Sequence, residues 1–266
     1  MTAQRSPGGA GSGRAGPGVS GSGGSGSARR IEVDPERVVR WVNGFAERHG
    51  ELHAIAGVSA WSSTQRSVAL TAADDATAVL EPLVPGDGSS PGDGSEPAAG
   101  RGPAGPGDLD GLAAWAMPPV AIALILVRRG GYAVGLGQGP ELISHKVGTR
   151  YVQSRTAAGG WSQHRFARRR DNQADALVVS VIEHTRRVVL ASPTGALIVG
   201  GDKSLVRDVL ADPRLARLAK LPRRELFDLP DPKLTVLKQA LRRGRAVRIL
   251  LSEPETTGMR NGEGGE

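Results

Sequence analysis

Residues 120–136 read VAIALILVRRGGYAVGL, and their apolar pattern is the clearest indication of the fold class. Residues 120–127 form a continuous apolar run rich in Val, Ile and Leu, which is typical of a β-strand. Residues 128–131 supply turn-forming residues, and residues 132–136 return as a second apolar segment. The pattern therefore predicts a β-hairpin.

Strands and helices alternate on the C-terminal side of this hairpin. Strands are predicted at residues 142–147, 150–155, 187–191, 196–199, 225–229 and 246–251. Helices are predicted at residues 163–185, 203–210 and 214–219, and from Asp231-Pro232 to Arg243. This order favours an α/β fold, with an α+β type of mixed sheet flanked by helices.

The N-terminal side carries one clear helix signal. Asp34-Pro35-Glu36 predicts a helix start with Asp34 as N-cap, and apolar residues then recur at helical spacing until about Gly50. Short strands are predicted at residues 54–60 and 67–71, with a possible turn at Asp74-Asp75.

Not all of the 266 residues are suited to folding. We expect a disordered, basic Gly/Ser-rich tail at residues 1–30, a disordered insertion rich in Pro, Gly, Asp and Ser at about 84–109, and a disordered tail at residues 253–266. The remainder, about 190 residues, is enough for one good-sized domain or two small ones.

Composition narrows the function classes. The formal charge is +7, and Arg supplies 29 of the 34 cations, which favours an anionic partner such as nucleic acid. The absence of Cys excludes disulfides, thiolate catalysis and Cys-ligated zinc. No signal peptide is evident, and the longest apolar run is shorter than the roughly 20 residues that span a bilayer. We therefore expect a cytoplasmic protein without membrane contact.

Residues 144–174 read SHKVGTRYVQSRTAAGGWSQHRFARRRDNQA and carry the chemistry. No Asp or Glu occurs between the first and last of the seven cations that we expect to contact RNA, which are Lys146, Arg150, Arg155, Arg165, Arg168, Arg169 and Arg170. A basic stretch is often only a solvated face, but such faces normally interleave opposite charges. The first half of the helix at 163–185 is almost wholly polar and basic, so we expect it to project from the body or to face a ligand.

A small-residue turn in this segment leads to a glutamine. Gly159 and Gly160 precede Trp161, Ser162 and Gln163. A carboxamide is no general base, but it donates and accepts hydrogen bonds at once, so it could orient a water molecule beside an ester. Trp161 could stack on a base or anchor the loop to the body, and these two interpretations stay open.

The run at residues 148–174 resembles the release-factor domain of actinobacterial peptidyl-tRNA hydrolases of the VMS-like release factor group. That group is related to the eukaryotic VMS/ankyrin-and-zinc-finger factor of ribosome quality control, and more distantly to eukaryotic and archaeal termination factors. The resemblance is most specific across residues 146–174 and extends loosely over residues 34–251. It departs from the termination factors in one respect, because Trp161 and Ser162 separate the glycines from Gln163.

The resemblance implies hydrolysis of the peptide–tRNA ester on stalled large ribosomal subunits. It places the catalytic residue at Gln163, in a loop formed with Gly159, Gly160, Trp161 and Ser162. The implied fold is that of the central catalytic domain of those termination factors, here over residues 31–252. The implied partners are the large subunit, its ribosomal RNA and the CCA end of peptidyl-tRNA, with no metal and no small-molecule cofactor.

Three alternatives compete with this interpretation. A metal-dependent nuclease needs clustered carboxylates, which the apolar strands lack. A nucleophilic Ser162 needs a nearby base, and His164 would point elsewhere on a helix. A non-catalytic ribosome- or tRNA-binding protein stays open, since composition cannot distinguish it from a hydrolase.

Overall fold

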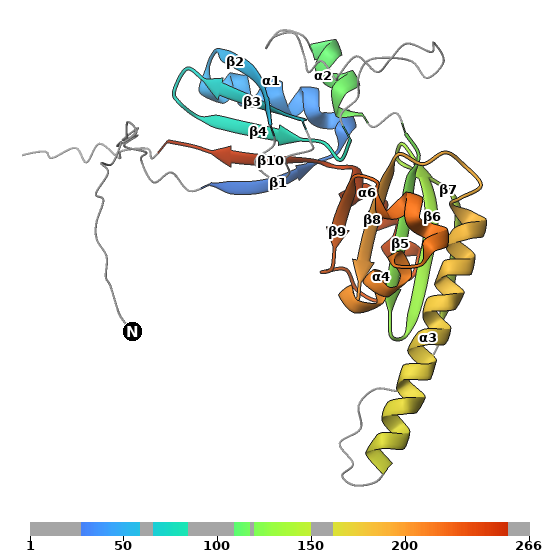
Figure 1. Ribbon diagram of the computed structural model, residues 1–266. Coiled ribbons are helices and arrows are strands. Elements are labelled where there is room, and N and C mark those ends of the chain that lie inside the picture. The colour runs from blue at the N-terminus through green and yellow to red at the C-terminus, as the bar shows by residue number, and fades with distance from the viewer. Residues whose placement is uncertain (1–27, 59–65, 85–108, 118–119, 150–161, 255–266) are drawn as a thin grey trace, which may run out of the picture.

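The computed structural model describes residues 28–58, 66–84, 109–117, 120–149 and 162–254 (Figure 1). The expected strand at 150–155 lies outside these residues. So do nearly all of the two expected tails and of the insertion at 84–109. The described chain folds around two five-stranded sheets flanked by helices, which confirms the predicted fold class.

The first sheet is antiparallel throughout and has the order β1-β10-β4-β3-β2. Its strands are β1 (Arg29–Val33), β2 (Leu52–Val58), β3 (Arg66–Ala72), β4 (Thr77–Glu81) and β10 (Val247–Ser252). Helices α1 (Val38–His49) and α2 (Leu109–Ala116) share its core through Phe45 and Trp115, which are both fully buried. Strand β10 lies between β1 and β4, so the C-terminal strand completes a sheet begun by the N-terminal one.

The predicted helix start near Asp34 is nearly right. A short 3-10 turn, η1 (Pro35–Arg37), precedes α1, and the helix ends at Gly50, whose φ of 90° suits glycine. The side chain of Asp34 caps no backbone N–H group. It faces Arg242 instead, with 3.3 Å between Oδ1 and Nε.

The second sheet is mixed and has the order β7-β6-β5-β8-β9. Its strands are β5 (Ile122–Arg128), β6 (Gly131–Gln138), β7 (Glu141–Thr149), β8 (Ala196–Gly201) and β9 (Arg223–Leu226). Strands β5 and β6 form the predicted antiparallel hairpin, whereas β8 runs parallel to both β5 and β9.

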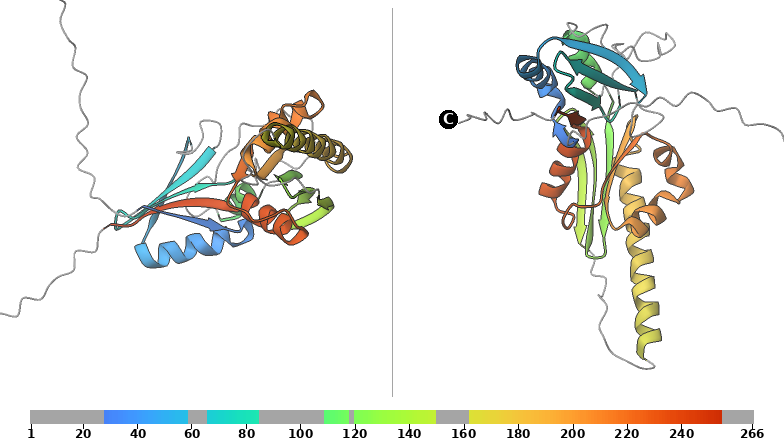
Figure 2. Two further views of the ribbon diagram at one scale, coloured as in Figure 1. Left: turned by 90° about the horizontal axis from the view of Figure 1, so that it is seen from below. Right: turned by 90° about the vertical axis from the view of Figure 1, so that its left-hand side faces the viewer.

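Helices cover both faces of the second sheet. On one face lies α6 (Leu234–Arg245), and on the other lie α3 (Ser162–Val188), α4 (Lys203–Leu210), η2 (Pro213–Leu215) and α5 (Ala216–Ala219) (Figure 2). Along β5, Ile125 packs toward α3 and its neighbour Leu124 packs toward α6. A strand buried on both faces carries apolar residues at every position, which accounts for the unbroken run at 120–127.

Some sequence predictions need correction. The predicted strand at 187–191 is wrong, because α3 continues to Val188 and the amide of Val189 still donates to the carbonyl of Thr185 at 2.8 Å. Strand β9 begins and ends earlier than the predicted 225–229. Strand β4 and helix α2 were not predicted, since both border the Pro/Gly-rich stretch that hides their periodicity.

Arginines near the end of α6 join the two sheets. The side chain of Arg245, only 4% exposed, donates two hydrogen bonds to Glu36, at 2.6 and 3.0 Å. Arg243 bridges Glu32 on β1 and Asp228 after β9. The buried Arg224 of β9 donates to the carbonyl of Ala246, the residue between α6 and β10. Burial lowers the pKa of Arg224 to about 9, and Arg248 adds to this effect, so its guanidinium is still charged at neutral pH.

Removing Glu36 and removing Arg245 should lower the free energy of unfolding by different amounts. Glu36→Gln leaves a buried guanidinium without a counter-charge and should lower the free energy of unfolding by roughly 3–5 kcal/mol. Arg245→Met leaves a Glu36 carboxylate that is 42% exposed and can be hydrated, so the cost should be below about 2 kcal/mol. Urea denaturation of the two variants measures the difference. Equal losses would contradict this account of the pair.

Candidate functional site

The side chains of helix α3 that the structure describes anchor its second half. Its 27 residues extend about 40 Å at 1.5 Å per residue. The apolar contacts to the sheet come from the C-terminal half, where Leu177, Val181 and Ile182 are buried and Ala174 packs at the edge of the same core. Figure 1 shows the N-terminal half running past the end of the second sheet. The sequence prediction that this basic half projects from the body is confirmed.

Polar contacts fix the anchored half in place. The hydroxyl of Ser144 on β7 donates to the carbonyl of Val188 at 3.1 Å, at the end of α3. One turn earlier, the carboxylate of Glu183 accepts from Arg214 at 2.7 Å, and Arg214 also pairs with Asp212 at 2.8 Å. These contacts hold α3 against both β7 and η2, so they set the direction in which its free half points.

Strand β7 leads toward the same end of the sheet. It is an edge strand, and its last residue, Thr149, pairs with Gly131 at the tip of the β5–β6 hairpin. The ring of Tyr132 lies over Gly148, where an added Cβ would be 2.5 Å from the ring atoms. Tyr132 also stacks on His184 of α3, with 5.3 Å between ring centroids. The chain therefore leaves β7 beside α3 and returns at Ser162 after residues 150–161.

The structure places the predicted site residues in three groups. Lys146 is exposed on β7. Arg150, Arg155, Gly159, Gly160 and Trp161 lie outside the described residues. The backbone of the third group lies in the first turns of α3, and its side chains are outside the description; its members are Ser162, Gln163, Arg165, Arg168, Arg169 and Arg170.

The start of α3 is electropositive for two reasons. The first amide groups of a helix have no intrahelical partner, and the helix dipole puts a partial positive charge there. The sequence adds four arginines within the first nine residues and no acid before Asp171. Gln163, in the first turn, is therefore a neutral side chain within a positive field. An anionic oxygen is the ligand that such a position favours.

Two arginines at the hairpin tip were not singled out from sequence, although the RRGG turn signals them. Arg128 donates to the carbonyl of Leu229 at 2.6 Å and faces Asp231 at 3.7 Å. Arg129 faces Asp202, the N-cap of α4, at 3.8 Å. Because these acidic residues and the carbonyl of Leu229 pair with Arg128 and Arg129, the two arginines stabilise the hairpin more than they extend the basic surface.

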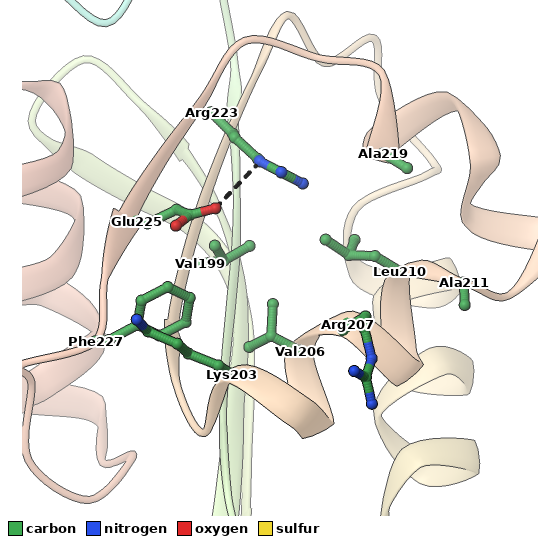
Figure 3. A pocket seen from close by; sticks show the side chains of 10 residues that line it. All are labelled: Val199, Lys203, Val206, Arg207, Leu210, Ala211, Ala219, Arg223, Glu225 and Phe227. Carbon is green, nitrogen blue, oxygen red and sulfur yellow. Dashed lines mark ion pairs between the residues drawn. The ribbon is translucent and has the colours of Figure 1, made fainter. Parts of the chain in front are cut away.

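A separate pocket of about 440 Å³ lies between α4, α5 and β9 (Figure 3). Its walls are mainly apolar, and its charged groups have partners, including Asp208 outside the pocket, which pairs with Arg207 at 3.2 Å. Arg223 pairs with Glu225 at 3.4 Å, and the Lys203 ammonium lies 5.1 Å from the centre of the Phe227 ring. The pocket lacks a histidine or a pair of carboxylates for acid–base chemistry, so the α3 start is the better candidate site.

The described residues contain no group of three or more His, Asp or Glu side chains that could hold a metal ion. Within the same residues, no helix is long and apolar enough to cross a membrane.

Comparison with known families identifies the second sheet and its helices. Residues 120–250 match the model of the Actinobacteria/Chloroflexi VLRF1 release factor. Residues 120–250 therefore belong to this release-factor family. The matched range starts at β5, contains the whole of α3 and ends in β10. This match supports a release-factor role.

Two solved structures are similar to parts of the chain. A structure titled "Vms1 mitochondrial localization core" is 12% identical, with a TM-score of 0.40, over 68% of this chain and 74% of that one. The archaeal translation termination factor aRF1 is 20% identical, with a TM-score of 0.32, over 47% of this chain; the match spans 34% of the archaeal factor. A comparison with curated protein sequences gives no match.

The anchor of α3 should weaken in mild acid through His184. Partial burial lowers its pKa, and the nearby Lys146 and Arg187 add to this effect. The unfolded chain therefore binds a proton at His184 more readily than the folded chain, so stability should fall as pH drops through about 6.5 and level off below the folded-state pKa. His184→Phe keeps an aromatic ring beside Tyr132 and should remove this part of the pH dependence. Urea midpoints at about pH 7.5 and about pH 5.5 test it; an unchanged pH dependence in the variant would contradict it.

Proposed function

We propose that the protein hydrolyses the ester between a nascent peptide and tRNA on stalled large ribosomal subunits. One observation carries the proposal: a helix anchored by its second half presents a basic first half that has no acid before Asp171, with Gln163 in its first turn. The family assignment supports a release-factor role, and ester hydrolysis is the chemistry that such a role requires.

The peptidyl-transferase centre is lined by ribosomal RNA, so a group that enters it must pass between phosphates. Arginines are suited to this, since their planar guanidinium groups donate to phosphate oxygens in pairs. A narrow helical projection of about 18 Å, formed by the residues of α3 before Ala174, would reach further than a loop close to the body. The CCA end of peptidyl-tRNA would meet the tip of this projection.

Gln163 would act by positioning and not by proton abstraction. Its carboxamide oxygen can accept from a water molecule, and its NH₂ group can donate to the ester or to the ribose. Unpaired amides at the start of α3 would donate to the oxyanion that forms as water attacks the carbonyl carbon. The tetrahedral intermediate then collapses by breaking the bond to the ribose oxygen, which takes up a proton from the attacking water and leaves as the hydroxyl of the tRNA, while the peptide is released with a free carboxyl group. Gly159 and Gly160 would let the backbone approach the crowded ester.

The catalytic assignment is tested by Gln163→Ala. Loss of a positioning and oxyanion-stabilising group should slow peptide release about 100-fold or more at saturating protein. Binding to the large subunit should change little, since the side chain is uncharged. The assay is release of labelled peptide from purified large subunits carrying peptidyl-tRNA. The matched control is Gln239→Ala, an exposed glutamine on α6.

Retention of wild-type release by Gln163→Ala would exclude the catalytic role of this residue. Binding without release by the unmodified protein would favour the alternative, a non-catalytic ribosome- or tRNA-binding protein.

The arginines of the projecting half should contribute to binding. Changing Arg168, Arg169 and Arg170 together to Ala removes about three phosphate contacts, which should reduce the slope of log K against log salt by about 2–3. A control that removes three exposed cations elsewhere is Arg217→Ala, Lys220→Ala and Lys233→Ala. Affinity for large subunits across a salt series distinguishes the two triple variants. An equal response of both would show that only net charge matters.

A further inference from the structure

A second basic surface lies on the other side of the molecule. A groove of about 420 Å³ runs between α1, β1 and the end of α6. The cations that line it are Arg37, Arg40, Arg48 and Arg242, and Trp41 forms part of its wall. Figure 2 (right) shows α1, in blue, on the α6 side of the second sheet, whereas α3, in yellow, is on the other side. The groove is thus separate from the projecting tip of α3.

Three of the groove arginines have no anionic partner among the residues that the structure describes. Arg37, Arg40 and Arg48 are exposed, and none forms an ion pair within the part of the chain that the structure describes. Two carboxylates in the same groove are already engaged by α6: Asp34 faces Arg242 at 3.3 Å, and Glu32 faces Arg243 at 3.1 Å. The groove therefore keeps a local excess of positive charge, with its acids held at fixed positions.

Gly44 leaves the floor of this groove open. Arg40, Gly44 and Arg48 follow at intervals of four, so they line one stripe of α1, with Trp41 beside Gly44. A glycine inside a helix is unfavourable relative to alanine. No packing constraint demands it here, because an added Cβ would meet only Nη1 of Arg48, at an ordinary 3.5 Å. The missing side chain leaves room for a flat group next to the indole of Trp41, whose ring stacks on Phe45 with 5.4 Å between centroids.

We propose that this groove is a second RNA-binding surface, which takes a single-stranded segment with one base beside Trp41 and its phosphates on the three free arginines. The inference rests on the proposed function for its biological setting, since it names a further contact with ribosomal or transfer RNA. RNA fits better than an acidic peptide or an anionic membrane. A nucleobase supplies the flat group that fits beside Trp41, and ribose hydroxyls can donate to the carboxylates of Glu32 and Asp34, whereas an acidic peptide or an anionic lipid headgroup supplies no base to stack.

Direct binding to RNA tests the groove without any reliance on catalysis. The probe is a fluorescein-labelled oligouridine of about 12 nucleotides, titrated with the full chain at several salt concentrations. The groove variant Arg37→Ala, Arg40→Ala, Arg48→Ala should bind about tenfold more weakly at about 0.15 M salt, with a salt slope lower by about 2. The control triple variant at Arg217, Lys220 and Lys233 should change affinity by less than about threefold.

Two further measurements isolate the base and exclude misfolding. An abasic version of the probe should bind the unmodified chain about fivefold or more weakly, and Trp41→Leu should remove most of this preference for bases. Gly44→Ala should raise the melting temperature by about 2–4 °C and yet weaken RNA binding, because the methyl group fills the floor of the groove. A more stable protein that binds less RNA cannot be explained by unfolding.

Equal loss of affinity in the groove and control variants would overturn the proposal. So would competition by polyglutamate or by phosphatidylserine vesicles that equals competition by unlabelled RNA. In the peptide-release assay the groove variant should need more protein to reach half of the maximal rate while keeping that rate, whereas Gln163→Ala should lower the rate itself. Failure of one proposal therefore leaves the other intact.

Discussion

The uneven burial of α3 is the constraint on which the functional arrangement depends. Most of the stability of a helix in a protein comes from packing of an apolar face, and the arginine-rich half of α3 has no acids at i+4 spacing to support it. The apolar stripe at Leu177, Val181 and Ile182 supplies that packing, because it shares a buried cluster with residues of β5 and β6. Because the hydrogen-bonded ladder continues without a break toward Ser162, burial at one end orders the backbone at the other.

The second sheet, which supports the projecting half of α3, is packed on both faces. Strand β5 is buried on both faces, and the helices on its two sides enclose separate apolar clusters. Arg245 and Arg243 then tie α6 to residues before α1, and β10 follows α6 directly into the first sheet. The two sheets share these charged contacts at one junction, and that junction determines how the α1 groove is oriented relative to the α3 tip.

The sequence predicts strongly patterned elements well. The hairpin at β5 and β6, the helix at 203–210 and the anchored part of α3 follow from apolar periodicity and from Asp202 as a cap. Elements without a local signal were missed or misread. Strand β4 is a five-residue segment between a turn and a Pro/Gly-rich stretch. Val188-Val189-Leu190 has a β-like composition, but these residues lie at the end of α3, where the carbonyl of Val188 accepts from Ser144 on β7. The groove at α1 was not predicted either, because it joins residues around 40 to Arg242, about 200 positions away.

The candidate site likewise has one part that the local sequence predicts and another part that depends on long-range packing. The basic run and Gln163 are evident in the sequence, whereas the projection that separates them from the body depends on which half of α3 is buried. A carboxylate in place of Gln163 would suit the positive field of free α3, but near RNA it would be repelled by phosphates. In the proposed mechanism, a neutral amide would avoid both capture by the arginines and repulsion by the RNA, so the tip could enter a phosphate-lined site and still hold a water molecule. The arginines and the amide would then serve separate tasks, binding and positioning, on one helix.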